Sequence, residues 1–220
     1  LDPELDQCLE VGAILFHVPS RSVLSQQSFL MPVAKNAAEP INRISADVTR
    51  LPQPWKEGLR YLQALLDASD ILVAHNAAFD RQWFGRHHLP EVSKRWLCTM
   101  EDISWPEDLY LRARPSVRDL ALAYGVPVWA AHRALTDCCY IAEVFSRCND
   151  LETLLMHGLE PRILMRAEVS YEQRHLARNA GFRWNDPIQG AWTRRLSTRE
   201  AFSLCFPVVV IEPEDESKIS

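Results

Sequence analysis

The stretch ILVAHNAAFD at residues 71–80 decides the predicted fold. Its apolar start at residues 71–74 is typical of a short buried strand. His75 and Asn76 then stand at the carboxyl end of that strand, where open α/β sheets commonly bind ligands. Asp80 follows one turn into a predicted helix. The stretch therefore predicts an α/β fold with polar groups gathered where the strand ends.

A second stretch, AHRALTD at residues 131–137, again places an aspartate five residues after a histidine. On one continuous helix, side chains five residues apart point roughly 140° away from each other, so His132 and Asp137 would not share a site. Both side chains reach one centre if His132 lies in the loop before the helix and Asp137 lies one turn inside it. We expect this arrangement, with Asp80 and Asp137 facing one solvent-open cleft that His132 borders.

Predicted strands and helices extend outward from both stretches. Apolar runs at residues 9–18 and 22–31 predict two antiparallel strands joined by a turn at Pro19, Ser20 and Arg21. The remaining elements expected up to residue 148 are an amphipathic helix at 54–68, a strand at 71–74, a helix at 77–87, a strand at 95–99 and helices at 116–124 and 134–148. This order predicts a mixed central sheet flanked by helices, in a domain of residues 1–150.

The pattern changes after about residue 150, and residues 161–211 predict a small α+β module of unknown role. Its expected elements are a helix at 168–180 closed by Gly181, short strands at 182–184 and 191–193, and a helix that opens with the capping box Ser197-x-x-Glu200. Residues 212–220 are acidic and polar, so we expect a disordered tail there.

Charge is distributed unevenly around a net value of −5. An overall negative charge argues against non-specific adhesion to nucleic acid. Residues 161–207 nevertheless hold 8 basic and 4 acidic residues, so basic charge concentrates in the module. The sequence contains no run of 18 uncharged apolar residues and its first ten residues are acidic, so we expect a cytoplasmic protein without a membrane partner. Six cysteines without CxxC spacing predict free thiols.

The pattern H-N-x-x-F-D, followed some fifty residues later by H-x-A-x-x-D, resembles the second and third motifs of DnaQ-like (DEDDh) 3′-to-5′ exonucleases of the proofreading type. Two further segments are similar to segments of that family: residues 41–49, with Asn42 where the family has histidine, and residues 98–104, with Cys98 where the family has aspartate. The resemblance covers about residues 1–148 and implies a ribonuclease H-like exonuclease fold.

The resemblance also implies roles for the residues of both motifs. Asp80 and Asp137 would be ligands of two divalent ions, Mg²⁺ or Mn²⁺, which carboxylate oxygens suit. His132 would be the general base, because a neutral imidazole takes a proton near neutral pH. The side chains expected beside the site as substrate contacts are His75, Asn76, Phe79 and Ile44. Of these, Asn76 and Ile44 are expected to contact the terminal nucleotide, whereas core packing is the favoured role of Phe79.

The family's first motif is an Asp-x-Glu pair on the central strand, and this sequence contains no Asp-x-Glu pair within a predicted strand. The residues Leu1-Asp2-Pro3 and the run LEVGAILF resemble the segment that comes directly after that motif in the family. We therefore expect the first strand to be missing from the N-terminus of this chain, and we expect the chain to be inactive without it.

The expected function is metal-dependent removal of nucleotides from 3′ ends of single-stranded DNA in proofreading or repair, with a DNA polymerase as a further partner. One alternative is a catalytically silent module that binds nucleic acid or associates with a polymerase. Another is an RNA-trimming exonuclease of the same superfamily, because every residue named above would serve both substrates.

Two tryptophans of the module, Trp184 and Trp192, leave two interpretations open. With Arg183, Arg194 and Arg195 they would form a face that stacks on bases and contacts phosphates of single strands. They would otherwise be core tryptophans beneath a solvated basic rim.

Overall fold

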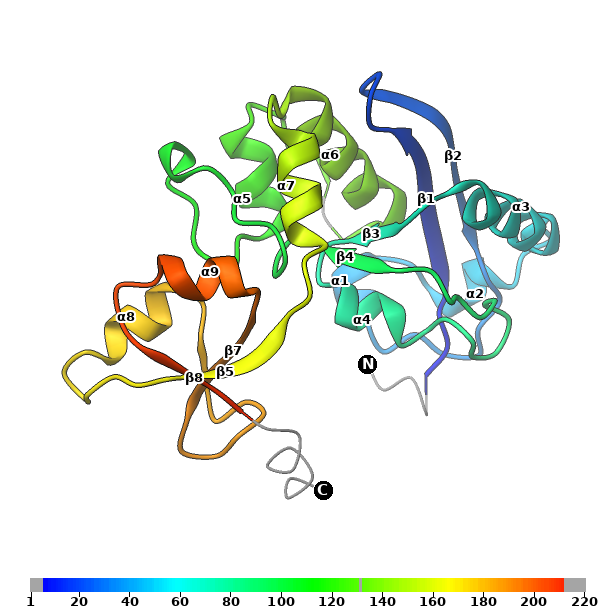
Figure 1. Ribbon diagram of the computed structural model, residues 1–220. Helices are drawn as coiled ribbons and strands as arrows, with labels where there is room; N and C mark the ends of the chain where they lie inside the picture. Colours follow the sequence, from blue (N-terminus) through cyan, green and yellow to red (C-terminus); the bar gives the residue numbers. More distant parts are fainter. Residues whose placement is uncertain (1–5, 131, 212–220) are drawn as a thin grey trace. The chain divides into compact units, whose positions relative to one another are not determined.

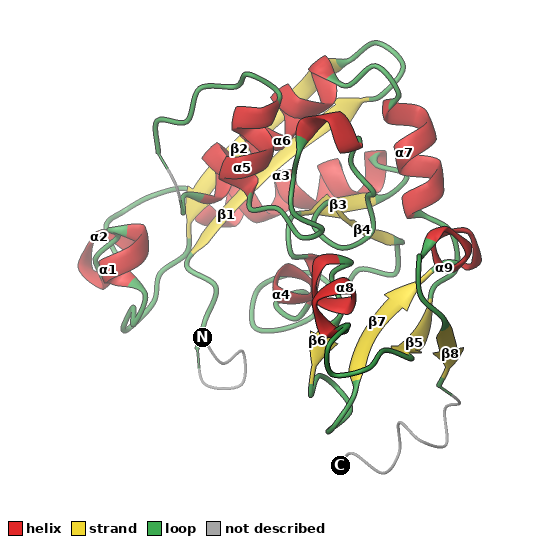
Figure 2. Ribbon diagram, turned by 90° about the vertical axis from the view of Figure 1, so that its left-hand side faces the viewer, coloured by secondary structure: helices red, strands yellow, loops and turns green. Residues whose placement is uncertain are grey.

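A computed structural model describes residues 6–130 and 132–211, which form two compact units. The first unit runs to Leu111 and from Pro115 to Gly158; the second comprises Arg112–Arg114 and the chain from Leu159 onward. Ala131, which opens the second motif, and the acidic tail expected at residues 212–220 lie outside the described residues. The fold is mixed α/β, with small sheets and helices (Figures 1 and 2).

The first unit contains four strands, seven α-helices and one short 3-10 helix within its described residues. In chain order they are β1 (Glu10–His17), β2 (Ser22–Leu30), α1 (Glu39–Asn42), α2 (Ala46–Thr49), α3 (Trp55–Ala68), β3 (Leu72–Ala74), α4 (Ala77–Arg81), β4 (Trp96–Cys98), η1 (Glu107–Leu109), α5 (Val117–Ala123), α6 (Ala134–Arg147) and α7 (Leu151–Gly158).

Strands β1 and β2 form the predicted antiparallel hairpin, which is confirmed with Glu10 opposite Leu30 at its open end. Successive side chains of a strand point to opposite faces, so β1 presents two different surfaces. Val11 packs in a core cluster with Leu62 of helix α3. On the other face, Phe16 makes an edge-on contact with Phe145 of α6, with ring centroids 5.9 Å apart. The hairpin is therefore covered by one helix on each side.

Helix α6 approaches β1 so closely that only glycine fits at the crossing. A β-carbon added at Gly12 would lie 2.2 Å from the backbone nitrogen of Leu135 and 2.4 Å from the carbonyl carbon of Ala134. The thiol of Cys138 points to the carbonyl oxygen of Gly12 at 3.5 Å. The helix backbone thus lies directly on the strand, which fixes the first turn of α6.

Strands β3 and β4 form a separate parallel pair, with Leu72 opposite Trp96. The sequence predicted one mixed sheet, whereas the described strands of the first unit form two sheets of two strands each. No described strand hydrogen-bonds to both pairs, so the predicted continuous sheet is not formed among the described residues.

The helices largely follow the sequence pattern, with one clear difference. Helix α3, which buries Leu62, Leu65 and Leu66, and helices α5 and α6 confirm the predicted helices. The helix predicted for residues 77–87 is wrong in length, because α4 ends at Arg81. Turns follow in which Gly85 and His87 take left-handed backbone conformations, and such residues end a helix.

The second unit folds around one antiparallel sheet with the strand order β6-β7-β5-β8. Its elements are β5 (Ile163–Ala167), α8 (Arg174–Asn179), β6 (Arg183–Trp184), β7 (Trp192–Leu196), α9 (Thr198–Ser203) and β8 (Val208–Val210). The helix predicted from residue 168 begins only at Arg174, because the Ser170 side chain supports a turn by accepting a hydrogen bond from the backbone N–H of Gln173. Strand β5 was not predicted.

The start of α9 is held by a buried network. The capping box between Ser197 and Glu200 is confirmed, with each side chain accepting a hydrogen bond from the other residue's backbone N–H. Arg162 forms an ion pair with Glu200 at 2.6 Å, and both side chains are largely buried. A buried carboxylate needs such partners to offset its lost hydration.

All six cysteines are free, as the sequence predicted. In the described part of the chain, no helix combines the length and the apolar character that crossing a bilayer requires.

The close crossing of α6 over β1 predicts that Gly12→Ala destabilises the first unit. The new methyl group would overlap backbone atoms, which must shift, and overpacking of this kind costs roughly 1–3 kcal/mol. The comparison variant is Gly58→Ala in helix α3, whose β-carbon would lie 2.7 Å from atoms of the Phe29 ring. There a side chain rather than backbone has to shift, and alanine gains about 1 kcal/mol of helix propensity, so the loss should be smaller than for Gly12→Ala. Urea unfolding followed by circular dichroism measures both variants. Equal urea midpoints for Gly12→Ala and Gly58→Ala would contradict a backbone-to-backbone contact between α6 and β1 at Gly12.

Candidate functional site

The first motif connects strand β3 to helix α4. The strand ends at Ala74, and Asn76 then takes a left-handed conformation (φ 68°) as the residue that precedes α4. Its carbonyl oxygen accepts a hydrogen bond from the backbone N–H of Phe79 at 2.8 Å. This sharp turn places Asp80 in the first turn of α4.

The second motif connects a loop to helix α6. His132 is exposed, has a left-handed backbone (φ 63°) and lies before the helix, while Asp137 lies in the first helical turn. The backbone N–H of His132 donates a hydrogen bond to the Asp137 carboxylate, and the two side chains also attract each other electrostatically. Of the two arrangements considered from the sequence, the structure has the one in which His132 and Asp137 share a site.

Asp80 and Asp137 lie close enough for their charges to influence each other, although 56 residues separate them in the chain. Burial, and secondarily the negative charge of Asp137, raise the pKa of Asp80 from its ordinary value of 3.8 to about 7. Burial also raises the pKa of Asp137; the charge of Glu10 adds to this effect and His132 opposes it. The site is thus a pair of half-buried carboxyl groups that resist being charged together.

Glu10, at the start of β1, is a third acidic residue beside this pair, and the sequence reasoning missed it. Its side chain is only 9% exposed and forms an ion pair with Arg133 at 2.8 Å. It also accepts a hydrogen bond from the backbone N–H of Ala134 at 3.0 Å, which satisfies a free donor at the start of α6. The available signal was an acid at the start of an otherwise apolar strand.

Two thiols border the pair. Burial raises the pKa of Cys8 to about 12 and that of Cys138 to about 12, and the charge of Asp80 adds to both shifts. Both residues therefore remain neutral thiols at neutral pH. A protonated thiol is neither a nucleophile nor a good metal ligand, so the chemistry of this site depends on the carboxyl groups and His132.

His75 is held by its neighbours. Its Nδ1 hydrogen-bonds to the hydroxyl of Thr99 at 2.9 Å, and burial lowers the pKa of its imidazole, an effect that the Pro115 carbonyl partly offsets. Next to Thr99, the sulfur of Cys98 accepts a hydrogen bond from the backbone N–H of Ala77 at 3.3 Å. His75 and Cys98 thus join β3, β4 and α4 at the base of the site.

The other two predicted substrate contacts differ in their exposure. Phe79 is 39% exposed and packs edge-on against Trp83, so it is not the core residue that the sequence favoured. Ile44 is only 5% exposed, so it offers little surface to a substrate. Asn42, where the resembled family has histidine, accepts a hydrogen bond from the Ile44 N–H at 3.1 Å and so shapes this loop.

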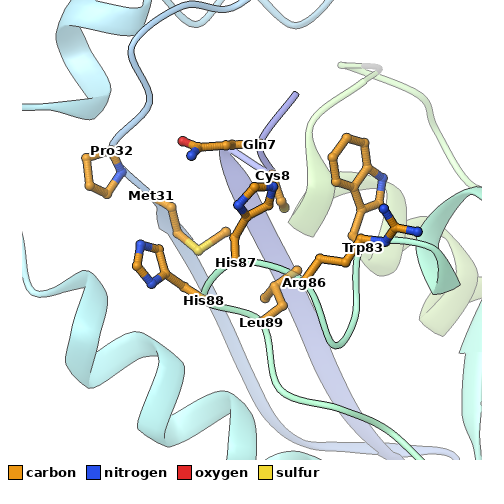
Figure 3. A pocket seen from close by; sticks show the side chains of 9 residues that line it. All are labelled: Gln7, Cys8, Met31, Pro32, Trp83, Arg86, His87, His88 and Leu89. Atoms are coloured by element: carbon orange, nitrogen blue, oxygen red, sulfur yellow. The ribbon is translucent and has the colours of Figure 1, made fainter. Parts of the chain in front are cut away.

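A small pocket lies beside Cys8 (Figure 3). Its volume is about 10 Å³, and its lining includes Met31, Trp83, His87 and His88. That volume corresponds to roughly one water molecule, so the pocket is too small for a nucleotide. Neither Asp80 nor Asp137 lines this pocket, whereas Asn76 and His132 are exposed on the surface.

Carboxylate oxygens are the ligands that Mg²⁺ and Mn²⁺ prefer, and the paired aspartates offer such donors. Their chemistry fits a cation, because a positive charge beside Asp80 and Asp137 would offset the burial and the repulsion that raise the pKa of Asp80. Among the described residues, no group of three or more His, Cys, Asp and Glu side chains is arranged to hold a metal ion.

Comparison with known proteins bears on the second unit. Residues 163–211 match a family described as a domain of unknown function (DUF8626). No curated protein and no solved structure matches the chain. The match begins with strand β5 and covers less than half of the chain, so the function of the first unit has to be inferred from its own residues.

The raised pKa of Asp80 predicts how the stability of the chain depends on pH. A carboxyl group whose pKa is higher in the folded state stabilises the fold at low pH, and this contribution is lost as the pH rises from about 4 through about 7. Asp80→Asn cannot ionise. Its free energy of unfolding should therefore rise relative to the wild type over this range, by at most about 4 kcal/mol.

Urea unfolding at pH 4 and at pH 8 measures this difference. Asp70→Asn, an exposed aspartate at the end of the α3–β3 turn, is the control and should show no such trend. If the difference in the free energy of unfolding between Asp80→Asn and the wild type stays constant with pH, the pKa of Asp80 is not raised in the folded state.

Proposed function

We propose that the first unit is the greater part of a metal-dependent 3′-to-5′ exonuclease domain of the DnaQ-like type, with a ribonuclease H-like fold. The observation that carries the proposal is that Asp80 and Asp137, each in the first turn of its helix, lie near enough for their charges to interact. The two aspartates come from separate motifs, and His132 interacts with the same carboxyl group. Two carboxylates and one exposed histidine are part of the set of groups that such a hydrolysis requires, the rest being the Asp-x-Glu pair.

The strand arrangement supports the same proposal. The antiparallel pair β1–β2 and the parallel pair β3–β4 are separate two-stranded sheets in the described chain. A strand lying between them would join both pairs into one mixed sheet. In DnaQ-like exonucleases the Asp-x-Glu pair lies on the central strand, and a strand with that pair would here bring two more carboxylates toward the paired aspartates.

In the proposed reaction, Asp80 and Asp137 hold divalent ions, Mg²⁺ or Mn²⁺, together with the Asp-x-Glu pair. When bound, these ions supply positive charge that activates water and stabilises the leaving oxygen. His132, exposed at the mouth of the site, takes the proton from the attacking water at its imidazole nitrogen. Asn76 and Phe79 contact the terminal nucleotide from the β3–α4 turn, and His75 keeps that turn in place.

Glu10 gives this site its shape. Its contacts with Arg133 and Ala134 hold the turn that carries His132 and the helix start that carries Asp137. Because Glu10 is already neutralised by Arg133, it is a positioning residue rather than a further metal ligand.

This proposal predicts that the 220-residue chain releases no nucleotides. Two carboxylates leave too few anionic oxygens to hold two divalent ions. An N-terminal extension that supplies an Asp-x-Glu strand of the family's pattern should confer Mg²⁺- or Mn²⁺-dependent shortening of a 5′-labelled single strand, read on a denaturing gel. In the extended chain, Asp137→Ala should abolish the activity and Asp70→Asn should preserve it.

Two outcomes would contradict the proposal. Metal-dependent release of mononucleotides by the 220-residue chain itself, lost on Asp137→Ala, would show that the described carboxylates suffice. No activity in the extended chain, with its fold intact by circular dichroism, would favour the silent binding module instead. Parallel DNA and RNA strands of one sequence distinguish the DNA exonuclease from the RNA-trimming alternative.

A second prediction uses the metal alone. If the two aspartates contribute to a cation site, millimolar Mn²⁺ should raise the melting temperature of the 220-residue chain, because a ligand that binds only the folded state stabilises it. The increase should disappear in Asp80→Asn and in Asp137→Asn, and it should persist in Asp70→Asn. An increase of equal size in all four proteins would place the cation elsewhere.

A further inference from the structure

The second unit carries an open groove that the proposed hydrolysis does not use. Its volume is about 570 Å³, within the range of known ligand sites. The side chains that matter for its chemistry are those of Tyr171, Arg174, Trp184, Trp192 and Arg166, which come from the β5–α8 region and from strands β6 and β7. The groove lies wholly within the part of the chain that matches the domain of unknown function.

Aromatic side chains dominate the exposed surface of this groove. Trp184 is 50% exposed and Tyr171 is 76% exposed. Trp192 packs against the core of the second unit and lies against Trp184, with ring centroids 5.5 Å apart. The core thus fixes one tryptophan, which in turn supports the exposed one. Large aromatic surface that faces solvent at a groove marks a binding site more often than a packing residue.

Arginines accompany these rings. The guanidinium group of Arg174 lies 3.8 Å from the centre of the Tyr171 ring, so its charge is held at the groove by a cation–π contact. Arg166 is exposed and forms an ion pair with Glu168 at 2.8 Å. The charged side chains that line the groove are those of Arg166, Arg174 and Glu168, so two basic groups stand against one acidic group.

The arginines that the sequence suggested for this role belong elsewhere. Arg194 donates a hydrogen bond to the carbonyl oxygen of Ala180 at 2.6 Å and lies against Gly181, so it holds the turn after α8. Arg183 forms an ion pair with Asp186 at 2.8 Å in the turn after β6. Neither Arg194 nor Arg195 lines the groove.

We propose that this groove binds single-stranded nucleic acid, with bases stacked on Trp184 and Tyr171 and phosphates beside Arg174 and Arg166. Exposed aromatic faces bind any unpaired base, and basic side chains between them track the backbone. The positive charge of Arg166 and Arg174 complements a polyanion. The groove is open rather than enclosed, which suits a strand that passes across it. The proposal stands on the second unit alone and does not depend on the exonuclease proposal.

The test uses the full 220-residue chain and a fluorescein-labelled dT12 strand, followed by fluorescence anisotropy in EDTA, which suppresses metal-dependent hydrolysis. Trp184→Ala should weaken binding roughly 5- to 150-fold, the effect of losing one stacked base. Trp184→Phe should retain most of the affinity, because a smaller aromatic ring still stacks. Phe202→Ala removes an aromatic ring that is 86% exposed on α9 but outside the groove, and it should bind like the wild type.

A salt titration tests the arginines. Arg174→Ala should lower the slope of log affinity against log salt by about 0.7, the value for one lost phosphate contact on a single strand. Arg178→Ala, an exposed arginine on the same helix α8 that does not line the groove, should leave the slope unchanged. Melting temperatures of all variants confirm that they are folded.

Three results would overturn the proposal. The first is that the wild type does not bind dT12 at low salt. The second is that Trp184→Ala and Phe202→Ala lose the same amount of affinity for dT12. The third is that a polyglutamate peptide of the same charge displaces labelled dT12 as well as unlabelled dT12 does, which would indicate a surface for acidic peptides. Trp184→Ala separates the two proposals, because it should weaken the binding of dT12 without changing the Mn²⁺-induced rise in melting temperature that the first proposal predicts.

Discussion

The first unit depends on one close contact, the crossing of helix α6 over strand β1 at Gly12. Backbone lies on backbone there, because a β-carbon at Gly12 would overlap Ala134 and Leu135. The carboxylate of Glu10 stabilises this contact by accepting hydrogen bonds from the Arg133 side chain and from the first N–H of the helix. The helix start therefore cannot shift along the strand without losing its cap.

The carboxyl pair shows how a site can oppose the stability of the fold that carries it. Asp80 comes from a tight turn after β3 and Asp137 from the helix fixed at Gly12, so neither can move away to relieve their repulsion. Burial of these acids disfavours their charged forms and weakens the fold at neutral pH, an effect that His132 opposes at Asp137 but not at Asp80. Glu10, which has Arg133, carries no such penalty.

Local patterns in the sequence were enough to predict the hairpin, helices α3, α5 and α6 and the loop position of His132. Alternation, helical spacing and capping residues act over a few neighbouring residues, which a single sequence displays. An acid at the start of an apolar strand marked Glu10 as unusual, but its role depends on an arginine 123 residues away, which local patterns do not reveal. Helix α8 starts later than predicted because the turn held by the Ser170 side chain competes with helix formation. The groove could not be predicted either, because it is formed by three segments that come together only in the folded sheet. The exposure of Trp184 likewise follows from the partner that Trp192 finds in the core.

Strand β8 forms an edge of the sheet of the second unit at which another molecule could pair. It pairs with β5 on one side, and in the described chain its other side pairs with no strand. An open edge that carries the exposed valines Val209 and Val210 is a template on which a strand from another molecule can add. The edge is only three residues long and follows Pro207, which lacks an N–H donor. Shortness therefore protects this sheet from self-association, and lengthening β8 by engineering would remove that protection.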